Sequence, residues 1–361
     1  MLKTPLFDTH VAMGARMVPF GSWEMPLQYK GILSEVRAVR TTAGIFDVSH
    51  MGRIEIIGDD AAILLSRVFG SNISGLEVSR AVYGVLCDYK GGIIDDAILY
   101  RIDNDRFLLV TNAANTDSIF EWITSSRITE NQVDIQVLTK KLAMIAVQGP
   151  RSMEIVAEVL KDSLSGIRPF GTIMVSLRGT EALIARTGYT GEIGFEVILS
   201  SEVATEFWNS LFTMGAIPCG LGARDVLRLE AGLLLHGSDM DVNVNPFEAG
   251  LQKFVNPDRV DYPAGEALRT IREAGTGRKL VGFRMLGRGI PRPGYDIRDG
   301  SVLIGKVTSG SVSPTLDINI GLGYVPSSFS SPGTSLRIGI RGRPVDAEVV
   351  TLPFYSRRKS V

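Results

Sequence analysis

Short strand-like runs alternate with glycine and proline turns from Lys279 onward, and this pattern constrains the fold more than any other feature of the sequence. The turns lie at Gly287–Pro293, Asp299–Gly300 and Ser331–Gly333. Many short strands separated by such turns are typical of a small all-β domain. We therefore predict a C-terminal β-barrel domain over residues 279–361. Residues 256–278 are polar and broken by Asn, Pro and Gly, and we predict a linker there.

Helix and strand signals are mixed in the chain before this linker. Helical patterns predict helices at Ala61–Phe69, Ser152–Leu160, Val203–Met214 and Ala223–Leu235. Strand-like runs lie at Tyr83–Leu86, Ile93–Ile102, Phe107–Thr111, Lys141–Val147 and Phe195–Leu199. A chain of 361 residues is too long for one ordinary domain. We predict an α+β fold with a central domain formed by residues 1–54 plus 137–255 and an inserted α+β domain over 55–136.

Charge and composition exclude several classes of function. Thirty-eight basic residues balance 39 acidic ones, which argues against a general nucleic-acid binder. Two cysteines and three histidines are scattered, so we expect no disulfide framework and no metal site. The N-terminus has no signal-peptide pattern, and no apolar run approaches the roughly 18 to 20 residues of a membrane span. We expect a cytoplasmic protein without a membrane partner.

The run Ile93–Ile102 is the most informative segment for chemistry, because it carries two adjacent carboxylates. Side chains alternate between the two faces of a strand. Asp96 therefore shares a face with Ile94, Ile98, Tyr100 and Ile102. We expect Asp95 to lie on the opposite face and to meet a cation or water. A carboxylate on an apolar face is costly unless it is paired, protonated or serving a ligand, so Asp96 either binds a ligand or has a structural role, in which it caps a neighbouring turn or bonds backbone amides.

Residues 186–196 contain three glycines that superficially resemble a phosphate-binding loop. No Lys-Ser/Thr pair follows them, and the next run is a strand rather than a helix, which excludes that reading. Two carboxylates, Glu192 and Glu196, lie beside these glycines. The pattern alone favours a solvated hairpin over a binding site for them.

Two further segments carry polar residues that could meet a ligand. In the helix predicted from Ala223, Arg224 lies near the helix start, where a cation is unfavourable for the helix dipole. Its presence there suggests that Arg224 reaches toward a ligand or a carboxylate. Residues 46–52 hold Asp, Ser and His together, but such close neighbours in a chain rarely form a catalytic triad. We interpret this segment as structural, with Met51 lining a pocket.

These segments, taken in order, resemble the glycine cleavage T-protein family along essentially the whole chain. The matching stretches are Thr4–Leu6, Trp23–Pro26, Phe46–Gly52, Gly91–Asp96, Asn112–Asn115, Gln148–Pro150, Thr187–Glu196, Gly220–Glu230, Asn245–Glu248, Thr308–Gly310 and Pro353–Tyr355. One such stretch would be a weak signal. More than ten in the same order are highly specific.

The resemblance implies a three-domain cloverleaf that holds tetrahydrofolate, with residues 1–54 plus 137–255 as the folate-binding domain and no metal. It also implies a partner, the lipoylated H-protein, whose arm carries an aminomethyl group. The expected activity is that of an aminomethyltransferase, which releases ammonia and forms 5,10-methylenetetrahydrofolate. An ionised carboxylate beside the folate would stabilise positive charge that develops on the one-carbon unit as ammonia leaves.

The resemblance also implies roles for individual residues. Asp96 matches the essential aspartate of the family, beside the reacting nitrogens of folate. Glu196 matches the glutamate that binds the pterin edge, where a carboxylate suits an amino group and a ring N–H. Arg224 matches the arginine of the pterin and channel region. The segments that line the pocket contain Met51, Tyr83, Asn112 and Tyr189.

Two alternative functions on the same fold stay open. The first is a folate-dependent S-demethylase or methyltransferase, which would move a methyl group and release no ammonia. The second is a non-catalytic folate-binding factor for iron–sulfur assembly. Such factors carry a cysteine motif before the last domain, and the comparable stretch here, residues 262–267, has no cysteine. The sequence therefore argues against the second alternative.

Overall fold

The computed structural model describes residues 1–128 and 132–357, which form the predicted α+β fold. The described chain divides into two compact units, named here the first and the second unit. The first unit comprises Met1–Leu86, Asp95–Gly188 and Glu192–Arg224, and the second comprises Cys87–Ile94, Tyr189–Gly191 and the chain from Asp225 onward. No helix within the described residues is long and apolar enough to cross a membrane.

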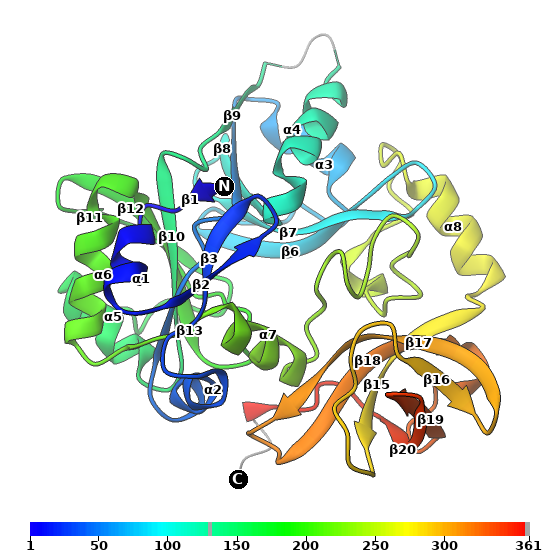
Figure 1. Cartoon of the computed structure of the whole chain (residues 1–361). Helices are drawn as coiled ribbons and strands as arrows, with labels where there is room; N and C mark the ends of the chain where they lie inside the picture. The colour runs from blue at the N-terminus through cyan, green and yellow to red at the C-terminus, as the bar shows by residue number, and fades with distance from the viewer. Residues whose placement is uncertain (129–131, 358–361) are drawn as a thin grey trace. The chain divides into compact units, whose positions relative to one another are not determined.

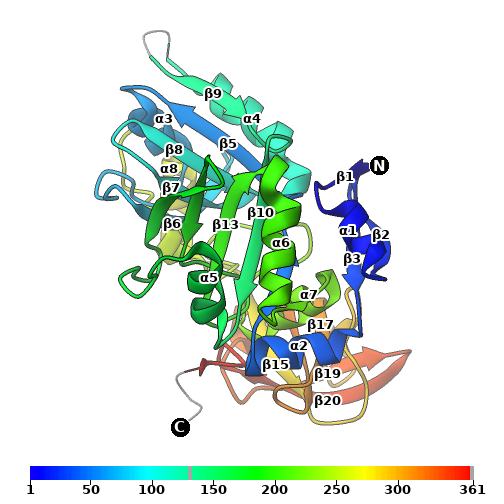
Figure 2. The same cartoon turned by 90° about the vertical axis from the view of Figure 1, so that its left-hand side faces the viewer.

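The larger sheet of the first unit has six strands in the order β11-β12-β13-β10-β4-β14. They are β4 (Gly44–Asp47), β10 (Leu142–Gln148), β11 (Thr172–Leu177), β12 (Thr180–Ala185), β13 (Gly194–Ser200) and β14 (Ile217–Pro218). Neighbouring strands are antiparallel, except that β14 runs parallel to β4. Helices α5 (Ser152–Leu160) and α6 (Ala204–Thr213, preceded by the short 3₁₀ helix η2, Ser201–Val203) lie in front of β10 and β13 in Figure 2. Ile155, Phe207 and Trp208 join the core under these helices.

The second sheet of the first unit has five strands in the order β6-β7-β8-β5-β9. They are β5 (Gly52–Ile57), β6 (Arg80–Cys87), β7 (Ile93–Arg101), β8 (Arg106–Thr111) and β9 (Asp134–Val137). Helix α3 (Ala61–Val68) contacts α4 (Thr116–Ser125), which packs against β5 and is preceded by the 3₁₀ helix η1 (Ala113–Asn115). Along β7 the residues from Asp95 to Leu99 alternate between buried and half-buried, so one face of this strand is shut away from solvent.

A small N-terminal sheet in the order β1-β3-β2 completes the first unit. Its elements are β1 (Leu2–Lys3), β2 (Arg16–Phe20) and β3 (Trp23–Gln28), with helices α1 (Phe7–Ala12) and α2 (Ile32–Thr41). The buried carboxylate of Glu35 accepts backbone N–H bonds from Tyr29, at 2.7 Å, and from Gly220, at 2.9 Å. Gly220 immediately precedes α7 (Leu221–Glu230), so Glu35 ties the start of α7 to the start of α2.

The second unit contains the predicted β-barrel, whose colour runs from yellow at β15 through orange to red in Figure 1. Six strands close in the order β15-β18-β17-β16-β19-β20. They are β15 (Arg278–Met285), β16 (Asp296–Asp299), β17 (Val302–Ser313), β18 (Ile318–Pro326), β19 (Ser335–Ile340) and β20 (Arg343–Val350), with η4 (Ser327–Phe329) after β18. Phe283 and Ile338 are among the fully buried residues of the barrel core. The expectation of a barrel after residue 278 is therefore confirmed.

Two sequence-based expectations about helices need correction. The helix predicted to reach Leu235 ends at Glu230, because Gly232 adopts a left-handed φ of 66° and the next N–H groups bond back to the last helical turn. The polar segment 256–278 is not all linker. It contains helix α8 (Gly265–Ala274), and a second short helix, η3 (Gln252–Phe254), lies just before it. The division into a central, an inserted and a C-terminal domain stays a prediction.

Candidate functional site

Asp96 is half-buried on β7, in the five-stranded sheet of the first unit. The phenol of Tyr83, on β6, donates to Oδ2 of Asp96 at 3.0 Å. The side-chain amide of Asn112, which follows β8, donates to Oδ1 of Asp96 at 2.8 Å and to the Asp96 carbonyl at 3.1 Å. Strands β6, β7 and β8 are neighbours in the sheet. Three residues that the sequence predicts as site residues therefore meet in one hydrogen-bonded group.

The position of Asp95 corrects the sequence-based expectation of a cation or water. Its side chain is completely buried. The backbone N–H of Asn112 donates to Oδ2 of Asp95 at 3.1 Å, and the side-chain amides of Asn112 and Asn115 donate to Oδ1 at 2.7 and 2.8 Å. Burial, followed by the negative charge of Asp96, raises the pKa of Asp95 above its ordinary value. Sequence alternation separates the two faces of β7 but does not reveal which face is the more buried one.

Glu196 lies on β13, between β10 and β12, and is only 4% exposed. Its Oε2 accepts the hydroxyl of Thr187 at 2.5 Å and the phenol of Tyr100 at 3.3 Å. Within residues 1–128 and 132–357, no hydrogen bond to Oε1 is found. Tyr100 lies four residues after Asp96 on the same face of β7, so the strand that carries Asp96 also supplies a hydrogen-bond donor to Glu196.

The solvated hairpin favoured for Glu192 and Glu196 is therefore wrong, because both side chains are shielded from water. Glu192 pairs with Arg40 on α2, with Nη1 and Oε1 3.0 Å apart and only 8% and 2% of the two side chains exposed. Sequence reasoning also missed Thr187 and Tyr100 as partners of Glu196. Tyr100 could have been found, since the alternation along β7 already places it on the face of Asp96.

Arg224 lies in the first turn of α7 and is half-buried. Its electrostatic neighbour is His50, which is 3% exposed. Burial, followed by the positive charge of Arg224, lowers the pKa of His50 to about 3, so the imidazole stays neutral at pH 7. The next residue, Met51, is half-buried, and its carbonyl accepts from the Arg53 guanidinium. The structure thus groups Arg224 with the segment that carries Met51.

The Asp, Ser and His of residues 46–52 do not form a triad. The histidine that binds Asp47 is His10, whose Nε2 lies 2.9 Å from Oδ2, while the Ser49 backbone N–H donates to Oδ1 at 2.8 Å. Burial opposes the charge on Asp47, but the hydrogen bond and charge of His10 outweigh it and hold the pKa of Asp47 at about 2. This buried group fixes the segment before Met51 and supports the structural interpretation.

Tyr189 belongs to the second unit, where its hydroxyl donates to the carbonyl of Leu234. It therefore falls in a different unit from the other predicted site residues. Within the described chain, no three or more His, Cys, Asp and Glu side chains gather in a way that could hold a metal ion.

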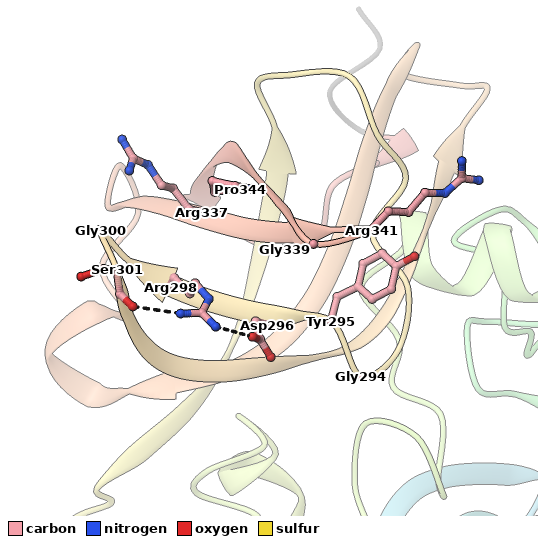
Figure 3. Close-up of a pocket in the computed structure, with 11 residues that line it drawn as sticks. Gly294, Tyr295, Asp296, Arg298, Gly300, Ser301, Arg337, Gly339, Arg341 and Pro344 are labelled. Carbon is pink, nitrogen blue, oxygen red and sulfur yellow. Dashed lines mark hydrogen bonds and ion pairs between the residues drawn. The ribbon is translucent and has the colours of Figure 1, made fainter.

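The barrel carries a groove of about 630 Å³ that is lined by none of the predicted site residues. Figure 3 shows Arg298 lying along its floor, bonded to Asp296 and to the Ser301 carbonyl, while Arg337 and Arg341 extend from its two ends. The strands flanking it, β16 and β19, pair over only two residue pairs.

Comparisons with known proteins agree along the whole chain. Residues 6–259 match the family model described as "GCVT N-terminal domain", and residues 278–356 match "Glycine cleavage T-protein C-terminal barrel domain". An aminomethyltransferase of Halothermothrix orenii is 43% identical over 358 residues, covering 98% of this chain and 100% of that protein. One from Symbiobacterium thermophilum is also 43% identical, over 363 residues, covering 98% of this chain and 97% of that protein.

A crystal structure of glycine cleavage system aminomethyltransferase T from Bartonella henselae superposes with a TM-score of 0.93 at 31% identity, covering 99% of this chain and 98% of that one. Fold, barrel and full-length similarity together define an enzyme of the aminomethyltransferase class. The chain belongs to the glycine cleavage T-protein family, a family of folate-binding proteins.

Proposed function

We propose that this chain transfers the one-carbon unit from the aminomethyl-dihydrolipoyl arm of H-protein to tetrahydrofolate, with release of ammonia and formation of 5,10-methylenetetrahydrofolate. Family membership supports the reaction class. The observation that carries the assignment of residues is that β7 supplies both Asp96 and Tyr100, whose phenol donates to the buried carboxylate of Glu196. Tetrahydrofolate would supply the nitrogen that accepts the one-carbon unit.

The donor and acceptor groups of the site fit a reduced pterin. The edge of a pterin presents an amino group and a ring N–H, both of which are hydrogen-bond donors. Glu196 offers a buried carboxylate whose Oε2 is occupied by Thr187 and whose Oε1 accepts from no group in the described residues. A carboxylate in this arrangement binds N–H donors strongly, because little water competes for it. We assign Glu196 to recognition of the pterin, with Met51 and Arg224 lining the same site.

Asp96 is assigned to catalysis because its carboxylate is held without being deeply buried. Tyr83 and Asn112 donate to its two oxygens and fix their direction. A fixed negative charge stabilises positive charge that develops on the transferred carbon as ammonia leaves, and fixed dipoles around it need no reorganisation. Holding the donor arm and the acceptor in line would contribute a further part of the rate. The chain then needs no covalent intermediate.

The test is an ammonia-release assay with aminomethylated H-protein, with and without tetrahydrofolate. We expect folate-stimulated release by the wild type and a loss of roughly 100-fold or more in kcat for Asp96→Asn, which keeps the shape and removes the charge. Asp134→Asn, an exposed position on the edge strand β9 of the same sheet, is the matched control and should stay fully active.

Two outcomes would contradict the proposal. Undiminished turnover by Asp96→Asn would remove Asp96 from its role. Methyl transfer to tetrahydrofolate from a sulfur compound, with no ammonia from loaded H-protein, would support the S-demethylase or methyltransferase alternative instead.

A further inference from the structure

Asp95 is a buried carboxylate held by neutral hydrogen-bond donors. Its side chain is 0% exposed, and its hydrogen-bond partners in the described residues are the N–H groups of Asn112 and Asn115. Removing a carboxylate from water costs free energy that three amide hydrogen bonds only partly offset. An asparagine of the same shape could accept hydrogen bonds through only one of its two terminal side-chain atoms, so the acid supplies a second acceptor oxygen here.

The side-chain amide of Asn112 lies between two carboxylates. Its Nδ2 is 2.7 Å from Oδ1 of Asp95 and 2.8 Å from Oδ1 of Asp96. An amide NH₂ group has two hydrogens at a fixed angle, so one can point to each carboxylate. Once the first hydrogen bond is made, the direction of the second is set.

The opposite orientation of this amide is unfavourable because it would bring acceptors together. Turning the Asn112 side chain by 180° would place its carbonyl oxygen against Oδ1 of Asp95 and Oδ1 of Asp96, both of which accept N–H groups in the structure. If position 95 were an asparagine, its own NH₂ could donate to that carbonyl, and the turned orientation would become acceptable. The acceptor oxygen that Asp95 presents therefore selects the orientation in which Asn112 donates to Asp96.

We propose that Asp95 is a positioning residue for aminomethyl transfer, which acts by locking the Asn112 amide so that it donates to Asp96. This inference rests on the proposed role of Asp96. Asp95 itself touches neither substrate, because it lies on the buried face of β7 and both its oxygens are occupied. Asp95 influences the reaction through the Asn112 side chain. This effect can therefore be separated by experiment from a general contribution of Asp95 to folding.

The experiment is a double-mutant cycle on folate-stimulated ammonia release, built from Asp95→Asn, Asn112→Ala and the combined variant. We expect Asp95→Asn to lower kcat about tenfold while KM for tetrahydrofolate changes less than threefold. In the Asn112→Ala background, the same change at position 95 should have no further effect on kcat. A purely structural role would lower activity equally in both backgrounds.

Thermal unfolding checks that each variant is folded. If Asp95→Asn does not fold, Asp95→Ser replaces it, since serine keeps one small acceptor in the buried space and removes the carboxyl group. Full activity of the folded variant would overturn the inference, as would a loss that is unchanged in the Asn112→Ala background or one that falls on KM alone. Asp96→Asn, run in parallel, separates the two ideas: an inactive Asp96→Asn with a fully active Asp95→Asn rejects only the inference about Asp95.

Discussion

The hydroxyl of Thr187 should determine how tightly the site holds its folate. The O–H···O distance to Oε2 of Glu196 is 2.5 Å, within the short range of charge-assisted hydrogen bonds. The phenol of Tyr100 donates to the same oxygen at 3.3 Å, beyond the usual range for O–H donors. A hydrogen bond to a charged group contributes about 1.5 to 3 kcal/mol. Thr187 therefore carries most of the force that orients the Glu196 carboxylate.

Replacing Thr187 by Val removes the hydroxyl and leaves a side chain of similar shape. We expect the affinity for tetrahydrofolate to fall about tenfold, which corresponds to about 1.4 kcal/mol. We expect kcat to change less than threefold, because the bonds of Tyr83 and Asn112 to Asp96 stay in place. Equilibrium binding of tetrahydrofolate and the dependence of ammonia release on its concentration measure the two quantities.

Two variants serve as controls. Thr187→Ser keeps the hydroxyl and should retain the affinity within about threefold. Tyr100→Phe removes the longer bond and should weaken binding less than Thr187→Val does. If Tyr100→Phe weakens binding as much as Thr187→Val, or if Thr187→Val lowers kcat and leaves affinity unchanged, the assignment of Thr187 as the anchor of Glu196 is wrong.

Two further predictions concern the surroundings of the site. A Cβ at Gly194 would lie 2.3 Å from the amide of Gln148, whose Nε2 donates to the Thr187 carbonyl. Gly194→Ala should therefore lower the free energy of unfolding by about 1 to 3 kcal/mol and weaken folate binding. An unchanged free energy of unfolding in urea would refute this prediction. For His50, the folded pKa is depressed to about 3, so its contribution to stability is present above pH 6.5 and lost as the pH falls toward 3. The stability advantage of the wild type over His50→Gln should therefore shrink by roughly 2 kcal/mol between pH 6.5 and pH 4.5, and a constant difference would mean that His50 protonates normally in the folded protein.

The sequence predicts the elements of the site better than their surroundings. Alternation along a strand is a local property, and it places Asp96 and Tyr100 on one face and Asp95 on the other, as the structure has them. The degree of burial of each face depends on residues that are distant in the chain. Asn112 and Asn115, which bond Asp95, come from a segment that follows the next strand. No local pattern could show that Asp95 would be the more buried of the two acids.

The ends of helices and the tertiary contacts of residues are likewise not determined by the local sequence pattern. The barrel is predictable because glycine and proline turns separate its strands in sequence. The end of α7 is not predictable from the sequence, because the helical pattern continues to Leu235 although the helix ends before Gly232. A Cβ at Gly232 would lie 3.3 Å from the Pro353 backbone, so its neighbour comes from the far end of the chain. A glycine followed by apolar residues carries no signal of such a contact.

The contrast between Glu192 and Glu196 shows how one segment yields two different acids. Both are shielded from water, and they lie four residues apart. Glu192 is neutralised by the guanidinium of Arg40, and this ion pair links the loop that carries Glu192 to α2. Among the residues that the structure describes, the donors to Glu196 are hydroxyl groups, which orient a carboxylate without cancelling its charge. A carboxylate paired with arginine has little attraction left for a ligand, whereas one held by hydroxyls keeps its negative charge for an incoming N–H donor. The type of donor, and not burial alone, therefore separates the structural acid from the binding acid.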